Sequence, residues 1–297
     1  MAHAPVVVSV NHKGGTGKTT TSRVLAQALA SLPKYNKGKP ILSVDLDPQG
    51  NTSRRWKLMT PNDDGVSVPI PHPELDGQNS SICDLWLNLL DQSKPNLAPE
   101  PYETSNPMIH VVPANEELMY EMIGIEKAKR PLMGRAMREW LRSADIYEKY
   151  SYVIIDTPPS KAALNEAALA AATHTYIPFI PEPQSVEGVF SIFSYLYAQQ
   201  QQRSSNDPLV LLGFLPNLVQ RTRLHNLHLK QLRDHTNFSQ HLMKVQLNRR
   251  IGYAETDDSL CQPDQVTDMV GTQIEFEANR FAKYIAERVR ETMPGGL

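Results

Sequence analysis

Residues 13–20, Lys-Gly-Gly-Thr-Gly-Lys-Thr-Thr, constrain the fold of this chain more than any other segment. A β-branched run from Pro5 to Val10 precedes them, and apolar residues at helical spacing follow between positions 25 and 32, which predicts a strand, a loop and a helix. Glycines let such a loop turn tightly and bring successive N–H groups onto one anion, and the start of the helix adds a favourable dipole. The segment is therefore predicted to bind phosphate groups.

The residues of this loop have different predicted roles. Lys18 adds a full positive charge to the phosphate site, and the hydroxyl of Thr19 can reach Mg²⁺. The alternative is a glycine-rich turn that only joins a strand to a helix, and Gly-Lys-Thr in this context argues against it. The expected nucleotide-binding residues are Gly14, Gly15, Thr16, Gly17, Lys18, Thr19 and Thr20.

Further apolar runs alternate with helix-like stretches along the chain. They occupy residues 41–46, 109–112, 152–155, 175–180 and 209–215. Together with the phosphate loop, this alternation predicts the α/β fold of a P-loop NTPase, with three αβα layers and a mostly parallel, doubly wound sheet. We expect a single domain of this kind over residues 1–297.

Two regions depart from the simple alternation. Nine of the 23 prolines lie between positions 61 and 113, so we expect a loop-rich insert over about residues 60–108, with one helix near residues 82–90. A final helix is expected over about residues 272–292, with one apolar stripe facing the body of the protein: Ile274, Ala278, Phe281, Ile285 and Val289.

The composition excludes several other classes of protein. The chain has 30 Lys and Arg against 32 Asp and Glu, and this net charge of −2 gives no overall reason to expect nucleic acid as a ligand. Cys83 and Cys261 are too few for a disulfide framework or a four-sulfur metal site, which favours a reducing cytoplasm. No basic segment precedes a long apolar run, and no stretch approaches 18 apolar residues, so we expect no signal peptide and no membrane span.

Acidic residues follow two of the buried strands. Asp45 and Asp47 stand in Asp-Leu-Asp-Pro-Gln-Gly-Asn, and Asp156 ends the run Val153-Ile154-Ile155 in a Walker B arrangement. Ligands of open α/β sheets bind beyond the carboxyl ends of the strands, so these carboxylates are candidates for metal and water handling. One of the first two could instead cap the following turn. We expect Asp156 to lie near Mg²⁺, partly through a water.

These motifs resemble the ParA/MinD family of deviant Walker A ATPases. The general phosphate-loop pattern would place a glycine at position 12, where His12 stands, and a second lysine, Lys13, follows, as in the family signature K-G-G-x-G-K-[ST]. The resemblance implies an ATPase that uses ATP and Mg²⁺ and forms a homodimer with ATP sandwiched between the subunits. It further implies that Lys13 reaches the phosphates bound by the partner subunit.

The resemblance also suggests roles for residues on neighbouring strands. Asp47 would orient or activate the attacking water, and Asp45 would help to hold the network around magnesium. Asn217 follows the run 209–215 at the position from which the family contacts adenine, and its side chain can both donate and accept. An asparagine at a strand end can equally be a turn residue.

Three readings compete on sequence alone: a ParA-like segregation ATPase, a MinD-like membrane positioner, and a metal carrier or small-molecule ligase of the same lineage. A ParA-like segregation ATPase, closest to the Soj type without an amino-terminal helix-turn-helix domain, would bind DNA nonspecifically and be released when a ParB-like centromere-binding protein stimulates hydrolysis. A MinD-like protein should end in a basic amphipathic helix, yet the final helix carries four basic and four acidic residues, which argues against a membrane. A protein that positions another cargo, such as a conjugation or chemotaxis complex, remains open. The two cysteines form no C-x-x-C pair, which excludes a metal carrier of this lineage. Lys13 argues against a small-molecule ligase, because ligases of this lineage usually lack the early lysine.

One segment stands out by its charge. Residues 218–252 contain seven basic residues and a single acidic one, Asp234, in a chain of net charge −2. Such asymmetry is typical of a face that binds a polyanion, so we expect DNA to bind there and the protein to associate with the nucleoid. The alternative is a pair of solvated helices with ordinary basic surfaces. The candidate DNA contacts are Arg221, Arg223, Lys230, Arg233, Lys244, Arg249 and Arg250.

Overall fold

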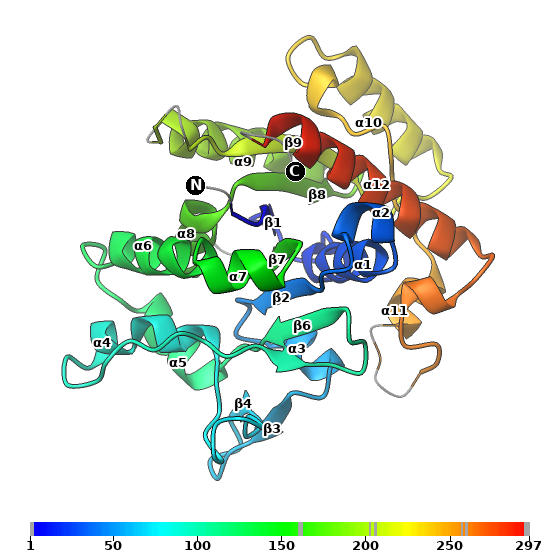
Figure 1. The fold of residues 1–297 in the computed structure, drawn as a ribbon. Helices are drawn as coiled ribbons and strands as arrows, with labels where there is room; N and C mark the ends of the chain where they lie inside the picture. Colours follow the sequence, from blue (N-terminus) through cyan, green and yellow to red (C-terminus); the bar gives the residue numbers. More distant parts are fainter. Residues whose placement is uncertain are drawn as a thin grey trace.

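A seven-stranded sheet forms the centre of the protein in the computed structural model, which describes residues 3–159, 163–201, 203–204, 207–256, 258 and 261–293 (Figure 1). The strand order is β5-β6-β2-β7-β1-β8-β9, and every neighbouring pair is parallel except β5 with β6. The predicted mostly parallel sheet is thereby confirmed. Its strands are β1 (Val6–Ser9), β2 (Ile41–Asp45), β5 (Tyr102–Glu103), β6 (Ile109–Val112), β7 (Tyr152–Asp156), β8 (His174–Phe179) and β9 (Val210–Pro216).

Apolar side chains cover both faces of this sheet, because successive residues of each strand point to opposite sides. Val7, Ile41 and Ile154 belong to one buried cluster, which includes apolar residues of α1 (Lys18–Ala30) and α12 (Gln273–Thr292). The opposite face packs against α5 (Glu116–Ile123), α6 (Arg130–Leu141), α8 (Ala163–Ala171) and α9 (Pro183–Gln201). The chain therefore has the three layers that the alternating pattern predicts.

The remaining short elements lie at the margins of this core. The proline-rich segment contains a small antiparallel hairpin and a short helical region, which begins close to the predicted position as a 3₁₀ turn and continues as an α-helix. The other helices connect strands or follow β9. The bounds of all these short elements are α2 (Pro33–Asn36), α3 (Asn51–Arg55), β3 (Met59–Pro61), β4 (Ser67–Pro69), η1 (Ile82–Trp86), α4 (Leu87–Leu90), α7 (Ala144–Lys149), α10 (Arg223–Asp234), η2 (Ser239–His241), α11 (Ile251–Glu255) and η3 (Val266–Asp268).

The long helix α12 packs along α1, as the apolar stripe predicts (Figure 1). The hydroxyl of Thr272 accepts the N–H of Glu275 and caps the start of the helix. Ala278, Phe281, Ile285 and Val289 are fully buried, whereas Ile274 at the first turn is only partly buried. Among the described residues, no helix is both long and apolar enough to cross a lipid bilayer.

Candidate nucleotide site and basic groove

The predicted phosphate loop joins β1 to α1 and has a fixed backbone. Gly15 and Gly17 have φ angles of 74° and 80°, in the left-handed region that favours glycine. Asn217, which follows β9, is buried beneath the loop and donates from its Nδ2 atom to the Thr16 carbonyl at 2.8 Å. A side chain at Gly17 would overlap the amide of Asn217. The loop is therefore shaped in part by a residue about 200 positions further along the chain.

Lys18 lies inside this loop with only 6% of its surface exposed. Its Nζ atom donates to the Lys13 carbonyl at 3.4 Å, so the side chain curls back along the loop. Burial lowers the pKa of Lys18, and the carboxylates of Asp156 and Asp47 oppose that change. A phosphate group bound in the loop would stabilise the ammonium in the same way, which suits the predicted role.

Asp45 and Asp156 end two adjacent parallel strands and are paired in register. Asp45 is fully buried and accepts the N–H of Ser53 at 2.9 Å, its hydroxyl at 2.7 Å and the N–H of Asp47 at 3.1 Å. The Ser53 hydroxyl in turn accepts the N–H of Ala114. Asp45 therefore anchors α3 to the end of β2, which agrees with the capping alternative for this residue.

Asp156 has one carboxylate oxygen without a partner among the described residues. Its Oδ2 atom accepts the Thr52 hydroxyl at 3.1 Å, whereas Oδ1 is buried and lacks any hydrogen bond to them. Burial and then the charge of Asp45 raise the pKa of Asp156, and the hydroxyl of Thr19 offsets part of this effect. A positive charge near Oδ1 would satisfy the orphaned oxygen and favour the carboxylate form.

These residues fit a magnesium ion held mainly by phosphate. The described residues contain no group of three or more His, Cys, Asp or Glu side chains arranged to hold a metal. Mg²⁺ in nucleotide sites usually takes one or two protein ligands and keeps several waters. The Thr19 hydroxyl and the Oδ1 atom of Asp156 are oxygen donors of this kind and would hold the ion, which would supply charge neutralisation for the phosphates.

Asp47 and Lys13 make contacts outside the phosphate loop. Asp47 is 7% exposed, and its Oδ1 atom accepts the N–H of Gln49 at 3.0 Å in a local turn. Lys13 is half-buried, and its Nζ atom lies 3.5 Å from Oε1 of Gln184 at the start of α9. Lys13 therefore points away from Lys18 and toward α9 in this single chain.

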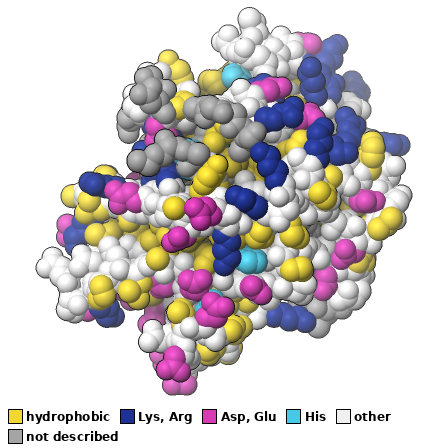
Figure 2. All heavy atoms as spheres, viewed as in Figure 1, with side chains coloured by type: hydrophobic (Ala, Val, Ile, Leu, Met, Phe, Trp, Pro, Cys, Tyr) yellow, Lys and Arg dark blue, Asp and Glu magenta, His cyan; other side chains and the backbone are white. Residues whose placement is uncertain are grey.

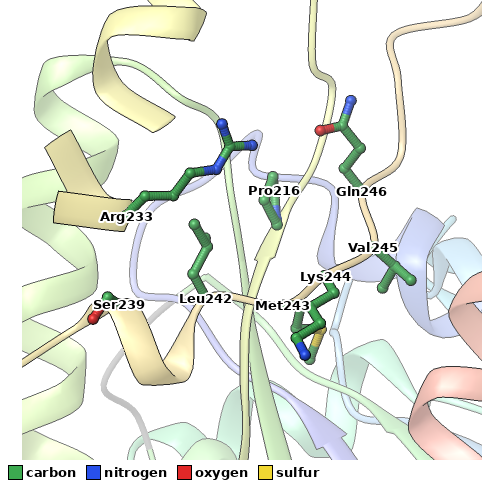
Figure 3. A pocket seen from close by; sticks show the side chains of 8 residues that line it. All are labelled: Pro216, Arg233, Ser239, Leu242, Met243, Lys244, Val245 and Gln246. Atoms are coloured by element: carbon green, nitrogen blue, oxygen red, sulfur yellow. The ribbon is translucent and has the colours of Figure 1, made fainter. Parts of the chain in front are cut away.

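The predicted DNA-binding residues separate into two groups. Five of the seven surround two adjoining hollows of about 630 Å³ and 270 Å³, which share Arg233 and Gln246; we call these hollows the basic groove. In Figure 3 Arg233 extends from α10 over the smaller hollow, while Lys244 points to its opposite side. The five are Arg221, Arg233, Lys244, Arg249 and Arg250, whereas Arg223 and Lys230 are exposed on α10 outside these linings.

Arg250 differs from the other members of the set. It binds Glu277 of α12 with Nε at 3.1 Å and Nη2 at 2.6 Å, and the carboxylate also accepts Asn248 and Tyr253. Among the described side chains, Arg250 is the member of the seven that forms an ion pair. Its charge is largely neutralised, so the groove keeps four cations that have no ion-pair partner in the described part of the chain. Figure 2 shows Lys and Arg side chains gathered over α10 and α12, at the upper right.

Several residues of the site were not expected from the sequence. Thr52 binds Asp156, and Ser53 binds Asp45. Both directly follow the Asp-Leu-Asp-Pro-Gln-Gly-Asn segment, so their position in the first turn of a helix after the motif could have identified them. Outside this site, Arg23 and Arg55 contact Thr256, which lies 233 and 201 positions away, and the local sequence contains no signal for such contacts.

The fold and this site define a P-loop nucleotide-binding protein of the α/β class. Residues 4–210 match the family model described as "AAA domain". The chain is 31% identical over 250 residues to the chromosome-partitioning ATPase Soj of Thermus thermophilus, covering 84% of this chain and 83% of that protein. It is 28% identical over 275 residues to a ParA family protein of Mycoplasma pneumoniae, covering 87% and 90%.

Solved structures agree with this assignment at the level of the fold. The ATP complex of a McdA variant from Cyanothece superposes with a TM-score of 0.71 at 15% identity, over 96% of this chain and 97% of that one. The chain belongs to the ParA family of P-loop ATPases, and the solved structures that share its fold include complexes with bound ATP and with bound magnesium. The family predicted from the deviant phosphate loop is thereby confirmed.

Proposed function

We propose that this protein is a DNA-segregation ATPase that binds DNA without sequence preference as an ATP-bound homodimer. A ParB-like centromere-binding protein would stimulate hydrolysis and release the dimer from the nucleoid. The Soj relative is a chromosome-partitioning ATPase, which supports this proposal, as does the ParA family of the Mycoplasma relative. A MinD-like or cargo-positioning role has no comparable support among these features.

The basic groove is the observation that carries the proposal. Four cations without an ion-pair partner among the described residues line it in a protein whose net charge is −2, so the remainder of the molecule is acidic by comparison. Contacts from such side chains to phosphates position DNA but carry no base information. Polar groups at the same place, Gln246 and Asn248, can add hydrogen bonds to the sugar-phosphate backbone.

The residues around the loop divide the chemistry of ATP hydrolysis between them. Lys18 and the loop N–H groups would hold the phosphates, and Thr19 with Asp156 would hold Mg²⁺. Asp47 lies next to this site with one oxygen bound to Gln49, and its second oxygen is proposed to orient the attacking water. Lys13 would leave Gln184 and reach the phosphates of the partner subunit, where a further cation would offset the charge of the leaving phosphates. Asn217 would contact adenine through its side-chain carbonyl oxygen, because its Nδ2 atom is bound to the loop.

The test is nucleotide-dependent DNA binding by the full chain. Fluorescence anisotropy should be recorded on two duplexes of unrelated sequence, each with ATP and Mg²⁺, with ADP and Mg²⁺, and without nucleotide. We expect equal binding to both duplexes with ATP and much weaker binding in the other two states. Arg135→Ala is the control, because Arg135 is exposed on α6 and pairs with Glu139 far along the chain from the groove. Binding of ATP without binding of either duplex would contradict the proposal and favour another cargo.

A further inference from the structure

Two buried arginines from different helices bind the same backbone carbonyl. Arg23 of α1 donates from Nη1 to the Thr256 carbonyl at 2.9 Å and from Nη2 to the Tyr253 carbonyl at 3.2 Å. Arg55, the last residue of α3, donates from Nε to the same Thr256 carbonyl at 2.6 Å and from Nη2 to the Asp264 carbonyl at 2.6 Å. Thr256 caps the end of α11. We call this arrangement the arginine clamp.

The clamp joins the two helices that leave the nucleotide site. Lys18 and Thr19 begin α1, and α3 follows the segment of Asp47 and binds Asp156 through Thr52. A cavity of about 560 Å³ lies between α1, α3 and α11, and its lining includes Thr19, Thr20, Asn51, Arg54, Arg55 and Ala254. Ligands drawn to Thr19 on one side and to the Asp47 segment on the other would change the spacing of α1 and α3. The Thr256 carbonyl, which both arginines bind, would move when the spacing of α1 and α3 changes.

The opposite end of α11 carries part of the basic groove. Arg250 caps its start, and Arg249 and Arg250 both line the larger hollow. The N–H of Arg249 donates to the Val219 carbonyl at 2.9 Å, so the pair is also tied to the chain after β9. Because α11 spans only five residues, its cap residues Arg250 and Thr256 lie about 9 Å apart along the helix axis. We therefore expect a displacement of Thr256 to reach Arg249.

We infer that Arg23 and Arg55 are positioning residues through which the nucleotide site sets the geometry of the basic groove. Guanidinium groups suit this role, because their charge is permanent and their forked donors hold two carbonyls at a fixed spacing. The inference rests on the proposed function, since the output that it explains is DNA binding controlled by ATP. It assigns that control to contacts outside the phosphate loop.

The experiment compares Arg55→Lys and Arg55→Met with wild type and with Arg135→Met, an exposed arginine of α6. Lysine keeps the charge of Arg55 but cannot hold two carbonyls in a fork, and it is the variant to interpret should Arg55→Met fail to fold. We expect both variants to bind ATP within about twofold of wild type and to form the ATP-dependent dimer by light scattering. The ratio of DNA affinities with and without ATP should fall at least roughly tenfold toward one. The effect of DNA on the affinity for ATP should decrease by the same factor, because coupling between two ligands is reciprocal.

Amide hydrogen exchange separates this inference from the proposed function. In wild type, ATP should change the exchange of residues 249–256 even without DNA, and Arg55→Lys should abolish that change. If wild type shows this change but binds no DNA, the clamp is supported and the DNA proposal fails. The inference is overturned if ATP leaves exchange in wild-type α11 unaltered, or if Arg55→Lys keeps both the wild-type exchange response and the wild-type affinity ratio.

Discussion

The number of unpaired cations in the basic groove predicts how DNA binding depends on salt. Arg221, Arg233, Lys244 and Arg249 have no ion-pair partner among the described residues, whereas Arg250 is bound to Glu277. If each of the four contacts one phosphate, a homodimer makes about eight contacts and the log–log slope is about −7. Raising the salt from about 50 to 200 mM should then weaken binding by roughly 10⁴-fold.

Alanine at Arg221 and Arg249 together removes two contacts per subunit and tests this count directly. The dimer then keeps about four contacts, so the slope should fall to about −3.6 and the same salt step should cost only roughly 10²-fold. Arg250→Ala should change the slope far less, because its charge is already matched by Glu277. Anisotropy titrations with ATP at four salt concentrations measure these slopes, with Arg135→Ala as the control for loss of one cation outside the groove. A double variant with the wild-type slope would refute the assignment of the groove as the DNA face.

Four further predictions concern the nucleotide site. Lys18→Ala should lose nucleotide binding measured by a fluorescent ATP analogue, whereas Lys13→Ala should bind nucleotide normally and fail to dimerise or hydrolyse; a dimer of Lys13→Ala would exclude its cross-subunit role. Asp47→Ala should bind ATP and dimerise but hydrolyse roughly 10²- to 10⁴-fold more slowly in single turnover, as expected on loss of a general base, and unchanged turnover would assign water activation elsewhere. Asp156→Asn should require far more Mg²⁺ for ATP binding. Burial raises the folded-state pKa of Asp156 above its unfolded value of 3.8. The nucleotide-free protein should therefore lose stability as the pH rises above 3.8 toward the folded-state pKa, by at most about 1.4 kcal/mol per pH unit. Urea unfolding at several pH values measures this loss, and a midpoint of Asp156→Asn that falls as steeply as that of wild type would contradict the prediction.

The sequence by itself determined the elements that depend on local pattern. The strand, loop and helix around residues 13–20 follow from β-branched residues, glycines with left-handed φ angles and helical periodicity, all within one short segment. Asp45 and Asp156 could be placed at one edge because parallel strands bring their carboxyl ends together. The ParA family was also indicated by Lys13, a second lysine in the same phosphate loop as Lys18.

The tertiary structure decided every feature that depends on the directions of distant side chains. The charge of residues 218–252 was visible in the sequence, but only the fold shows that Glu277 neutralises Arg250 and that Arg223 and Lys230 lie outside the groove. The orphaned oxygen of Asp156 and the clamp of Arg23 and Arg55 have no local signal either. Their partners come from other elements of the fold, and a hydrogen bond requires a few tenths of an ångström of precision that only the packed core provides.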